Sequence, residues 1–158
     1  MIRQLAILFC CTLLSTNVTA AKLTPGDPAP EFNLQDLSGK KHTFADLRTK
    51  SPVLLFFWST ECGFCRVMAP KRQKLHAERA AAGLTVAGID IDFNMREQVE
   101  AFVRERKLDF LILHGILDNA DVVEAYGVPG TPTLVLVGRD GRVVYYGHSL
   151  EEATRKIQ

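Results

Sequence analysis

The stretch Val53-Leu-Leu-Phe-Phe-Trp-Ser-Thr-Glu-Cys-Gly-Phe-Cys65 joins a continuous apolar run to a pair of cysteines. The unbroken apolar residues from Val53 to Trp58 predict a strand that is buried on both faces, as in the middle of a partly parallel sheet. The segment that follows is rich in good helix formers, so we expect a helix from Cys62 to Ala82, with Gly83 as its stop signal. The two cysteines therefore lie where a buried strand gives way to a helix.

This position favours redox chemistry at the cysteine pair. The first amide N–H groups of a helix have no partner within the helix, and the helix dipole favours negative charge at that end. A thiolate at Cys62 would be stabilised there, which lowers its pKa and makes it the attacking group. Cys65 lies one turn into the helix on the same face, where it can resolve a mixed disulfide with Cys62. A pair of buried structural cysteines, or an isolated metal clip, is the alternative for the same spacing.

The bulk composition indicates one folded domain. A chain of 158 residues has the length of a single domain, and 47% apolar with 23% charged residues is enough for a packed core. The formal net charge is +1. A charge so close to zero gives no electrostatic footprint for DNA or RNA, so we expect no nucleic-acid partner.

The N-terminus has the pattern of a signal peptide. Arg3 supplies a positive start, Leu5 to Leu14 forms a short apolar run, and Val18-Thr-Ala-Ala21 offers small residues for cleavage. We therefore expect residues 1–20 to direct export, in a bacterium to the periplasm, and residues 21–158 to form the folded domain. The alternative is an uncleaved anchor, which would attach the protein to the membrane.

Removal of residues 1–20 leaves two of the four cysteines, Cys62 and Cys65. Two thiols cannot build a disulfide framework, and they cannot complete a tetrahedral zinc site. A bridge across so short a loop also constrains little of the unfolded chain. Redox chemistry by a Cys62–Cys65 disulfide, with no further cofactor and no metal, explains the pair best.

Hydrophobic patterning predicts further elements around the decisive stretch. The expected strands are a hairpin of residues 31–37 and 41–44, followed by residues 84–91, 109–113, 133–137 and 142–146. The expected helices are residues 95–106, residues 119–126 and a short last helix opened by a capping box, Ser149-Leu-Glu-Glu152. Strands alternate with helices and the last strands form a hairpin, which predicts an α/β sandwich with a mixed sheet.

Three stretches together resemble the thioredoxin superfamily, and most of all its TlpA/ResA-type, redoxin-like thiol–disulfide oxidoreductases. They are Gly26-Asp-Pro-Ala-Pro-Glu-Phe-Asn-Leu34, the segment from Phe57 through Cys65 to Pro70, and Tyr126-Gly-Val-Pro-Gly-Thr-Pro-Thr133 followed by Asp140-Gly141. The resemblance implies a thioredoxin-like α/β sandwich with a central mixed β-sheet, an N-terminal β-hairpin extension and a TlpA-type βα insertion between residues 93 and 118.

The same resemblance implies roles for residues near the cysteines. Cys62 and Cys65 would be catalytic. Pro132 would follow a cis peptide bond and pack against the dithiol, and Thr131 would present its backbone to a substrate peptide as a short strand addition. An ordinary strand-entry turn is the alternative for Thr131-Pro132. The residues expected to bind substrate or support the site are Trp58, Gly63 and Phe64.

The function implied by the resemblance is the reduction of protein disulfides in the periplasm. The partners would be protein disulfide substrates, with cytochrome c maturation as one client pathway, and a membrane thiol donor that reduces the pair again. We expect the protein to act as a monomer.

Several positions depart from the family pattern. Thioredoxins carry a buried Asp six residues before the first cysteine, but here Phe56 stands there, so no carboxylate is expected as a proton acceptor at that position. Glu61 replaces the usual Trp, and its charge either raises the pKa of Cys62 or is solvated. ResA-type proteins carry a Glu where this chain has Met68. Phe64 offers no charge to the thiolate, which argues mildly against a strong oxidase.

Three other functions remain open. A disulfide oxidase or isomerase would use the same fold. A thiol peroxidase usually has the pattern P-x-x-x-T-x-x-C, but Leu55 and Ser59 occupy its Pro and Thr positions. A copper-binding module would use soft thiolates for Cu(I), although Sco-type copper proteins have C-x-x-x-C and a distant His.

The remaining polar residues carry no metal-ligand spacing. The four histidines, His42, His76, His114 and His148, are scattered, and we expect surface or turn roles for them. Asp90 and Asp92 alternate at the end of a predicted strand, which we interpret as a turn.

Overall fold

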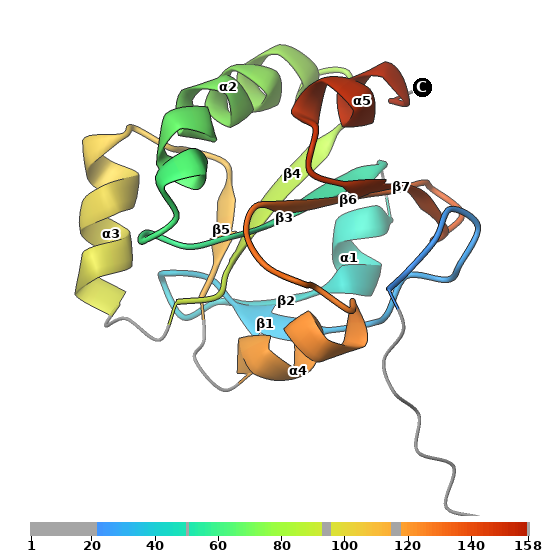
Figure 1. The fold of residues 1–158 in the computed structure, drawn as a ribbon, viewed down its shortest axis with the longest axis horizontal. Coiled ribbons are helices and arrows are strands. Elements are labelled where there is room, and N and C mark those ends of the chain that lie inside the picture. Colours follow the sequence, from blue (N-terminus) through green and yellow to red (C-terminus); the bar gives the residue numbers. More distant parts are fainter. Residues whose placement is uncertain (1–21, 50, 93–95, 115–117, 158) are drawn as a thin grey trace, which may run out of the picture.

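The computed structural model describes residues 22–49, 51–92, 96–114 and 118–157, and it has a five-stranded sheet at its centre (Figure 1). The strands, in their order across the sheet, are β5 (Leu111–Leu113), β4 (Thr85–Asp90), β3 (Val53–Trp58), β6 (Thr133–Val137) and β7 (Val143–Gly147). β3, β4 and β5 run parallel, whereas β6 and β7 are antiparallel to their neighbours. The mixed sheet and the central place of β3 confirm the predicted fold class.

Helices cover both faces of this sheet (Figure 1). One face carries α2 (Gly63–Arg79), α3 (Arg96–Glu105) and α5 (Leu150–Arg155). The other face carries α1 (Phe44–Arg48), α4 (Asp118–Ala125) and the hairpin of β1 (Asn33–Gln35) and β2 (Lys41–Thr43). The architecture is a thioredoxin-like α/β sandwich with an N-terminal hairpin, as the resemblance implied.

The apolar run of β3 divides its side chains between two cores. Leu54, Phe56 and Trp58 pack toward α2 and α3, while the alternate residues Leu55 and Phe57 pack toward α1 and α4. Every residue of the strand is buried. Because side chains alternate along a strand, only an unbroken apolar run can fill both cores.

The N-terminal hairpin forms, but the second strand ends earlier than expected. We predicted a strand from Lys41 to Phe44, whereas Phe44 begins helix α1. Thr43 caps this helix, because its hydroxyl accepts the backbone N–H of Asp46 at 3.1 Å. Five residues are too few for helical periodicity to be visible, so the Thr-x-x-Asp cap was the only available signal.

The capping box predicted for α5 is half formed. The Ser149 hydroxyl accepts the backbone N–H of Glu152 at 3.2 Å, as expected. In a complete capping box the backbone N–H of Ser149 would donate to the Glu152 side chain. Here this N–H donates to the Tyr145 hydroxyl at 3.0 Å instead. A tertiary partner from β7 has taken the place of the local one.

The predicted signal peptide and its possible role as an anchor lie outside the described residues, so both stay predictions. Within residues 22–157 as described, no helix is long and apolar enough to cross a membrane.

We expect Gly88→Ala to destabilise the fold. Gly88 lies opposite Phe56 in the β3–β4 register, and a Cβ there would stand 3.0 Å from both the Phe56 ring and Trp58 Nε1. Both aromatic side chains are buried, so the extra methyl should lower the free energy of unfolding by about 1–3 kcal/mol.

Chemical denaturation with intrinsic fluorescence would measure this change. Gly63→Ala is the matched control, because a Cβ at Gly63 meets nothing within 4 Å. The control should keep or slightly raise stability, since alanine is the better helix former. If Gly88→Ala and the wild type were equally stable, Phe56 and Trp58 would be able to shift and make room for the methyl group.

Candidate active site

The cysteine pair lies at the N-terminus of α2, directly after the loop that follows β3. Cys62 is the N-cap of the helix, and its Sγ accepts the backbone N–H of Cys65 at 3.1 Å. The two residues form a disulfide, with their Cα atoms 5.2 Å apart. In the reduced state, the same N–H donor and the helix dipole would stabilise a thiolate at Cys62.

The two sulfurs differ in their access to solvent. Cys62 is half-buried, whereas Cys65 is 1% exposed and packs into the core under α2. A macromolecular disulfide can therefore approach Cys62 but not Cys65. This asymmetry allows one sulfur to attack from outside and the other to resolve from inside.

Hydrogen bonds fix the loop before the disulfide. The backbone N–H of Thr60 donates to Asp92 Oδ2 at 2.5 Å, which ties the loop to the end of β4. The backbone N–H of Glu61 donates to the Ser59 hydroxyl at 3.0 Å, and that of Cys62 donates to the Ser59 carbonyl at 3.2 Å. The Glu61 residue itself is exposed.

The Thr131-Pro132 peptide bond is cis, as the resemblance implied. Thr131 is half-buried and Pro132 is buried. The Pro132 carbonyl accepts a hydrogen bond from His148 Nδ1 at 2.6 Å, and the Thr133 hydroxyl donates to the Gly130 carbonyl at 2.7 Å. His148 is exposed in the bend before α5, which agrees with the expected surface or turn role, and this bond also ties it to the cis-proline loop.

The other predicted site residues lie at different depths. Trp58 is 2% exposed, and its ring packs against Phe102 at a centroid distance of 5.2 Å. Its ring is part of the core and does not reach solvent. Gly63 is exposed, and Phe64 is 60% exposed on the first turn of α2. Phe64 is thus an apolar contact surface beside the disulfide.

With this geometry in place, comparisons with known proteins identify the family. The model of the AhpC/TSA family matches residues 25–146. The chain belongs to this family. Among curated proteins, it is 32% identical over 142 residues to the thiol-disulfide oxidoreductase ResA of Bacillus thuringiensis, covering 86% of this chain and 80% of that one. It is 36% identical over 120 residues to the thioredoxin-like protein YneN of Bacillus subtilis, covering 73% and 66%.

A solved structure with a thioredoxin domain has the same fold as this chain. The thioredoxin domain of a thiol-disulfide oxidoreductase from Bacteroides vulgatus superposes with a TM-score of 0.77 at 26% identity, covering 85% of this chain and 95% of that one. These relatives confirm a TlpA/ResA-like member of the thioredoxin superfamily. The protein is accordingly an enzyme, a thiol–disulfide oxidoreductase.

This AhpC/TSA member also contains a buried polar cluster that the sequence analysis misassigned. Asp90 at the end of β4 is 1% exposed and His114 directly after β5 is 5% exposed, so neither has the turn or surface role that we predicted. His114 Nδ1 and Asp90 Oδ2 are 2.7 Å apart. The backbone N–H of Asp92 donates to Asp90 Oδ1 at 3.3 Å, and the Asn119 amide donates to the Asp90 carbonyl.

Burial decides the charge state of this cluster. Desolvation, and then the nearby Asp92 charge, raise the pKa of Asp90 to about 8. Desolvation also lowers the pKa of His114 below its usual value. Both directions favour a protonated carboxyl that donates to a neutral imidazole, a charge state that the last predictions below test. Within the described parts of the chain, no group of three or more His, Cys, Asp or Glu side chains could hold a metal ion.

A signal for this cluster was present in the strand order. β3, β4 and β5 are parallel, so their carboxyl ends meet at one edge of the sheet. The disulfide follows β3, and Asp90 and His114 follow from β4 and β5 at the same edge. Polar residues at the carboxyl ends of parallel strands commonly converge on a site. The predicted strands would have indicated this convergence once they were arranged side by side and parallel.

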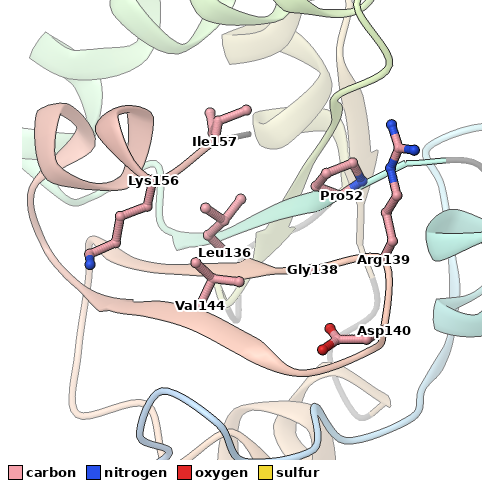
Figure 2. A pocket seen from close by; sticks show the side chains of 8 residues that line it. All are labelled: Pro52, Leu136, Gly138, Arg139, Asp140, Val144, Lys156 and Ile157. Atoms are coloured by element: carbon pink, nitrogen blue, oxygen red, sulfur yellow. The ribbon is translucent and has the colours of Figure 1, made fainter.

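A cavity of about 520 Å³ lies at the opposite end of the sheet (Figure 2). β6 is antiparallel to β3, and Val137 pairs with Val53, the first residue of β3, whereas Cys62 follows the last one. This cavity is therefore separate from the disulfide. The residues that line it are Pro52, Leu136, Gly138, Arg139, Asp140, Val144, Lys156 and Ile157.

Proposed function

We propose that the protein reduces disulfides of other exported proteins through the Cys62/Cys65 dithiol. The observation that carries the proposal is the disulfide at the N-terminus of α2, with a half-buried Cys62 outside and a buried Cys65 inside. Thiol–disulfide exchange needs an accessible attacking thiolate and a second thiol within reach of it. Both requirements fit this pair.

The reaction proceeds in two exchanges. The Cys62 thiolate attacks one sulfur of the client disulfide, a mixed disulfide forms, and the other client sulfur leaves as a thiolate. The Cys65 thiolate then attacks Cys62 Sγ and releases the second client thiolate. Two electrons pass to the client and the pair ends as the Cys62–Cys65 disulfide. A membrane thiol donor must then return two electrons.

The client polypeptide would lie across the cis-proline loop and the first turn of α2. Thr131 is half-buried and can offer its backbone for a short strand addition. Phe64 presents an exposed ring and Gly63 leaves room for close approach, whereas Trp58 and Pro132 are buried and would support the site from within the core. We propose a monomer that needs no metal or other cofactor.

Export by residues 1–20, and hence action in the periplasm, belongs to the same proposal. The reductive direction is what the TlpA/ResA resemblance implies, and the absence of a charged residue between the cysteines, where Phe64 stands, argues in the same sense.

The reduction potential of the Cys62–Cys65 pair tests the direction of electron flow. Equilibration against glutathione or dithiothreitol should give a value near or below that of thioredoxin, about −270 mV. A value toward about −120 mV, that of the strongest oxidants of this fold, would reverse the direction and support an oxidase or isomerase. The same protein should reduce insulin disulfides, and Cys62→Ser should abolish that activity.

A thiol peroxidase is the second candidate, because the matched family model is that of AhpC/TSA proteins. The Pro and Thr of the peroxidatic pattern are replaced by Leu55 and Ser59, and Leu55 is fully buried in the core. We therefore expect no peroxide consumption above a Cys62→Ser control when dithiothreitol is the recycling thiol. Catalytic consumption would favour the peroxidase.

A further inference from the structure

Arg72 is a buried cation on α2. Its residue is 1% exposed, and it is one of the largest side chains that are fully enclosed. Its guanidinium carbon lies 4.3 Å from the centroid of the Phe56 ring. Within the described residues, Arg72 forms no ion pair with a carboxylate, and its Nε has no hydrogen-bond partner. An isolated buried charge is costly, so this arrangement requires a compensating interaction.

The guanidinium lies close to the disulfide. Its Nη1 is 3.5 Å from the carbonyl oxygen of Cys65. Arg72 comes two turns after Cys65 on the same face of α2, and helical side chains lean toward the helix N-terminus. A carbonyl oxygen and the Sγ of one cysteine are at most about 5 Å apart, so the cation lies within about 9 Å of the Cys65 sulfur. The Cys62 sulfur, which is bonded to it, lies one S–S bond further away, within about 11 Å of the cation.

We propose that Arg72 is a positioning residue whose buried positive charge stabilises the thiolate that appears when the Cys62–Cys65 disulfide is reduced. Reduction takes up two electrons and, near neutral pH, one proton, and it leaves one thiolate and one thiol. The neutral disulfide gives the cation no counter-charge, whereas the reduced pair does. This inference rests on the redox role proposed above and names the group that tunes it.

Phe56 gives the proposal its structural basis. Phe56 occupies the position where thioredoxins carry a buried Asp, and the Arg72 guanidinium packs over its ring. The buried charge near the cysteine pair is therefore positive in this chain, whereas the buried Asp of thioredoxins would be negative. Burial lowers the pKa of Arg72 to about 10, so the guanidinium stays charged at neutral pH.

The other titratable groups on the segments around the pair differ from Arg72 in their access to water or in their partners. Glu61 and Arg66, the chain neighbours of Cys62 and Cys65, are exposed, and water screens their charges. Asp92, at the end of β4, faces the loop and accepts the N–H of Thr60. His148, before α5, is exposed and binds the Pro132 carbonyl. Arg72 is the charged group with the least access to water among them.

The thiolate titration of the reduced protein tests the proposal. Absorbance at the thiolate band should show that Arg72→Met raises the pKa of Cys62 by about 0.5–1 unit, a three- to tenfold loss of thiolate at fixed pH. The equilibrium with glutathione should shift toward the disulfide form by about the same factor. Arg72→Lys should restore most of both changes, and the exposed Arg66→Met is the matched control.

Two results would overturn the proposal. One is a folded Arg72→Met protein with a wild-type titration and a wild-type glutathione equilibrium. If that variant does not fold, the wild type supplies the second test, because the NMR signal of the Arg72 Nε–H should follow the thiolate titration in the reduced protein only. A signal without that inflection would contradict the proposal. Neither measurement needs a client, so failure to reduce insulin would count against the proposed function alone.

Discussion

A Cys65→Ser protein will stop at the mixed disulfide and accumulate covalent complexes with its clients. The resolving residue is the buried Cys65, which is 1% exposed and whose backbone N–H donates to Cys62 Sγ. No other cysteine lies in residues 21–158, so nothing else in the folded domain can attack the mixed disulfide. Release of reduced client should slow by about a thousandfold or more, because the two sulfurs act as one unit.

Non-reducing gels of cells that express the variant would reveal the complexes, and their masses would identify the clients. Cys62→Ser is the matched control, because a buried Cys65 cannot reach a macromolecular disulfide and should capture nothing. Capture by Cys62→Ser, with none by Cys65→Ser, would exchange the roles of the two cysteines. Capture by neither would remove protein disulfides as the substrate class.

The fold was predictable wherever a single segment determines its own structure. The six apolar residues 53–58 are typical of a strand that is buried on both faces, and the helix formers after Cys65 indicate a helix without any tertiary information. Helix α1 was missed because five residues carry no period. The half-formed cap of α5 was missed because Tyr145, a residue of the preceding strand, takes the place of a local partner.

The same distinction applies to the site. Cys62 and Cys65 are neighbours in sequence, and the strand before them and the helix after them indicate their chemistry. His114 and Asp90 are 24 residues apart, and only the parallel order of β4 and β5 brings them together. Arg72 belongs to a helix with many exposed basic residues, and no local pattern distinguishes the one that turns inward.

The Asp90–His114 pair makes stability depend on pH in a defined window. In the folded state the pKa of Asp90 is about 8, against 3.8 as its ordinary value. Between those values the folded protein holds a proton that the unfolded chain releases, so Asp90 makes stability fall as pH rises. His114 acts in the opposite direction up to its ordinary pKa of 6.5, because its folded-state pKa is lowered. Below pH 6.5 the contributions of Asp90 and His114 to stability oppose each other. Above that pH only the decrease in stability that Asp90 causes remains.

We therefore expect the free energy of unfolding to drop by about 2 kcal/mol between pH 6.5 and pH 8, since one pKa unit corresponds to about 1.4 kcal/mol. Asp90→Asn should remove this drop, because an amide can donate to His114 as the protonated carboxyl does and has no proton to lose. Denaturant titrations across that range would measure both proteins, with the exposed Asp121→Asn as the control.

The stability of Asp90→Asn at pH 6 separates the neutral pair from an ion pair. A neutral pair predicts that Asp90→Asn is more stable than the wild type by about 3 kcal/mol at this pH. The amide reproduces the hydrogen bond and does not have to take up a proton about two pH units above 3.8, the ordinary pKa of Asp90. An ion pair predicts a loss of about 3 kcal/mol or more, since a buried imidazolium would lose its counter-charge. A loss of that size would mean that Asp90 is ionised beside a charged His114. The edge of the sheet that carries the disulfide would then hold a buried ion pair.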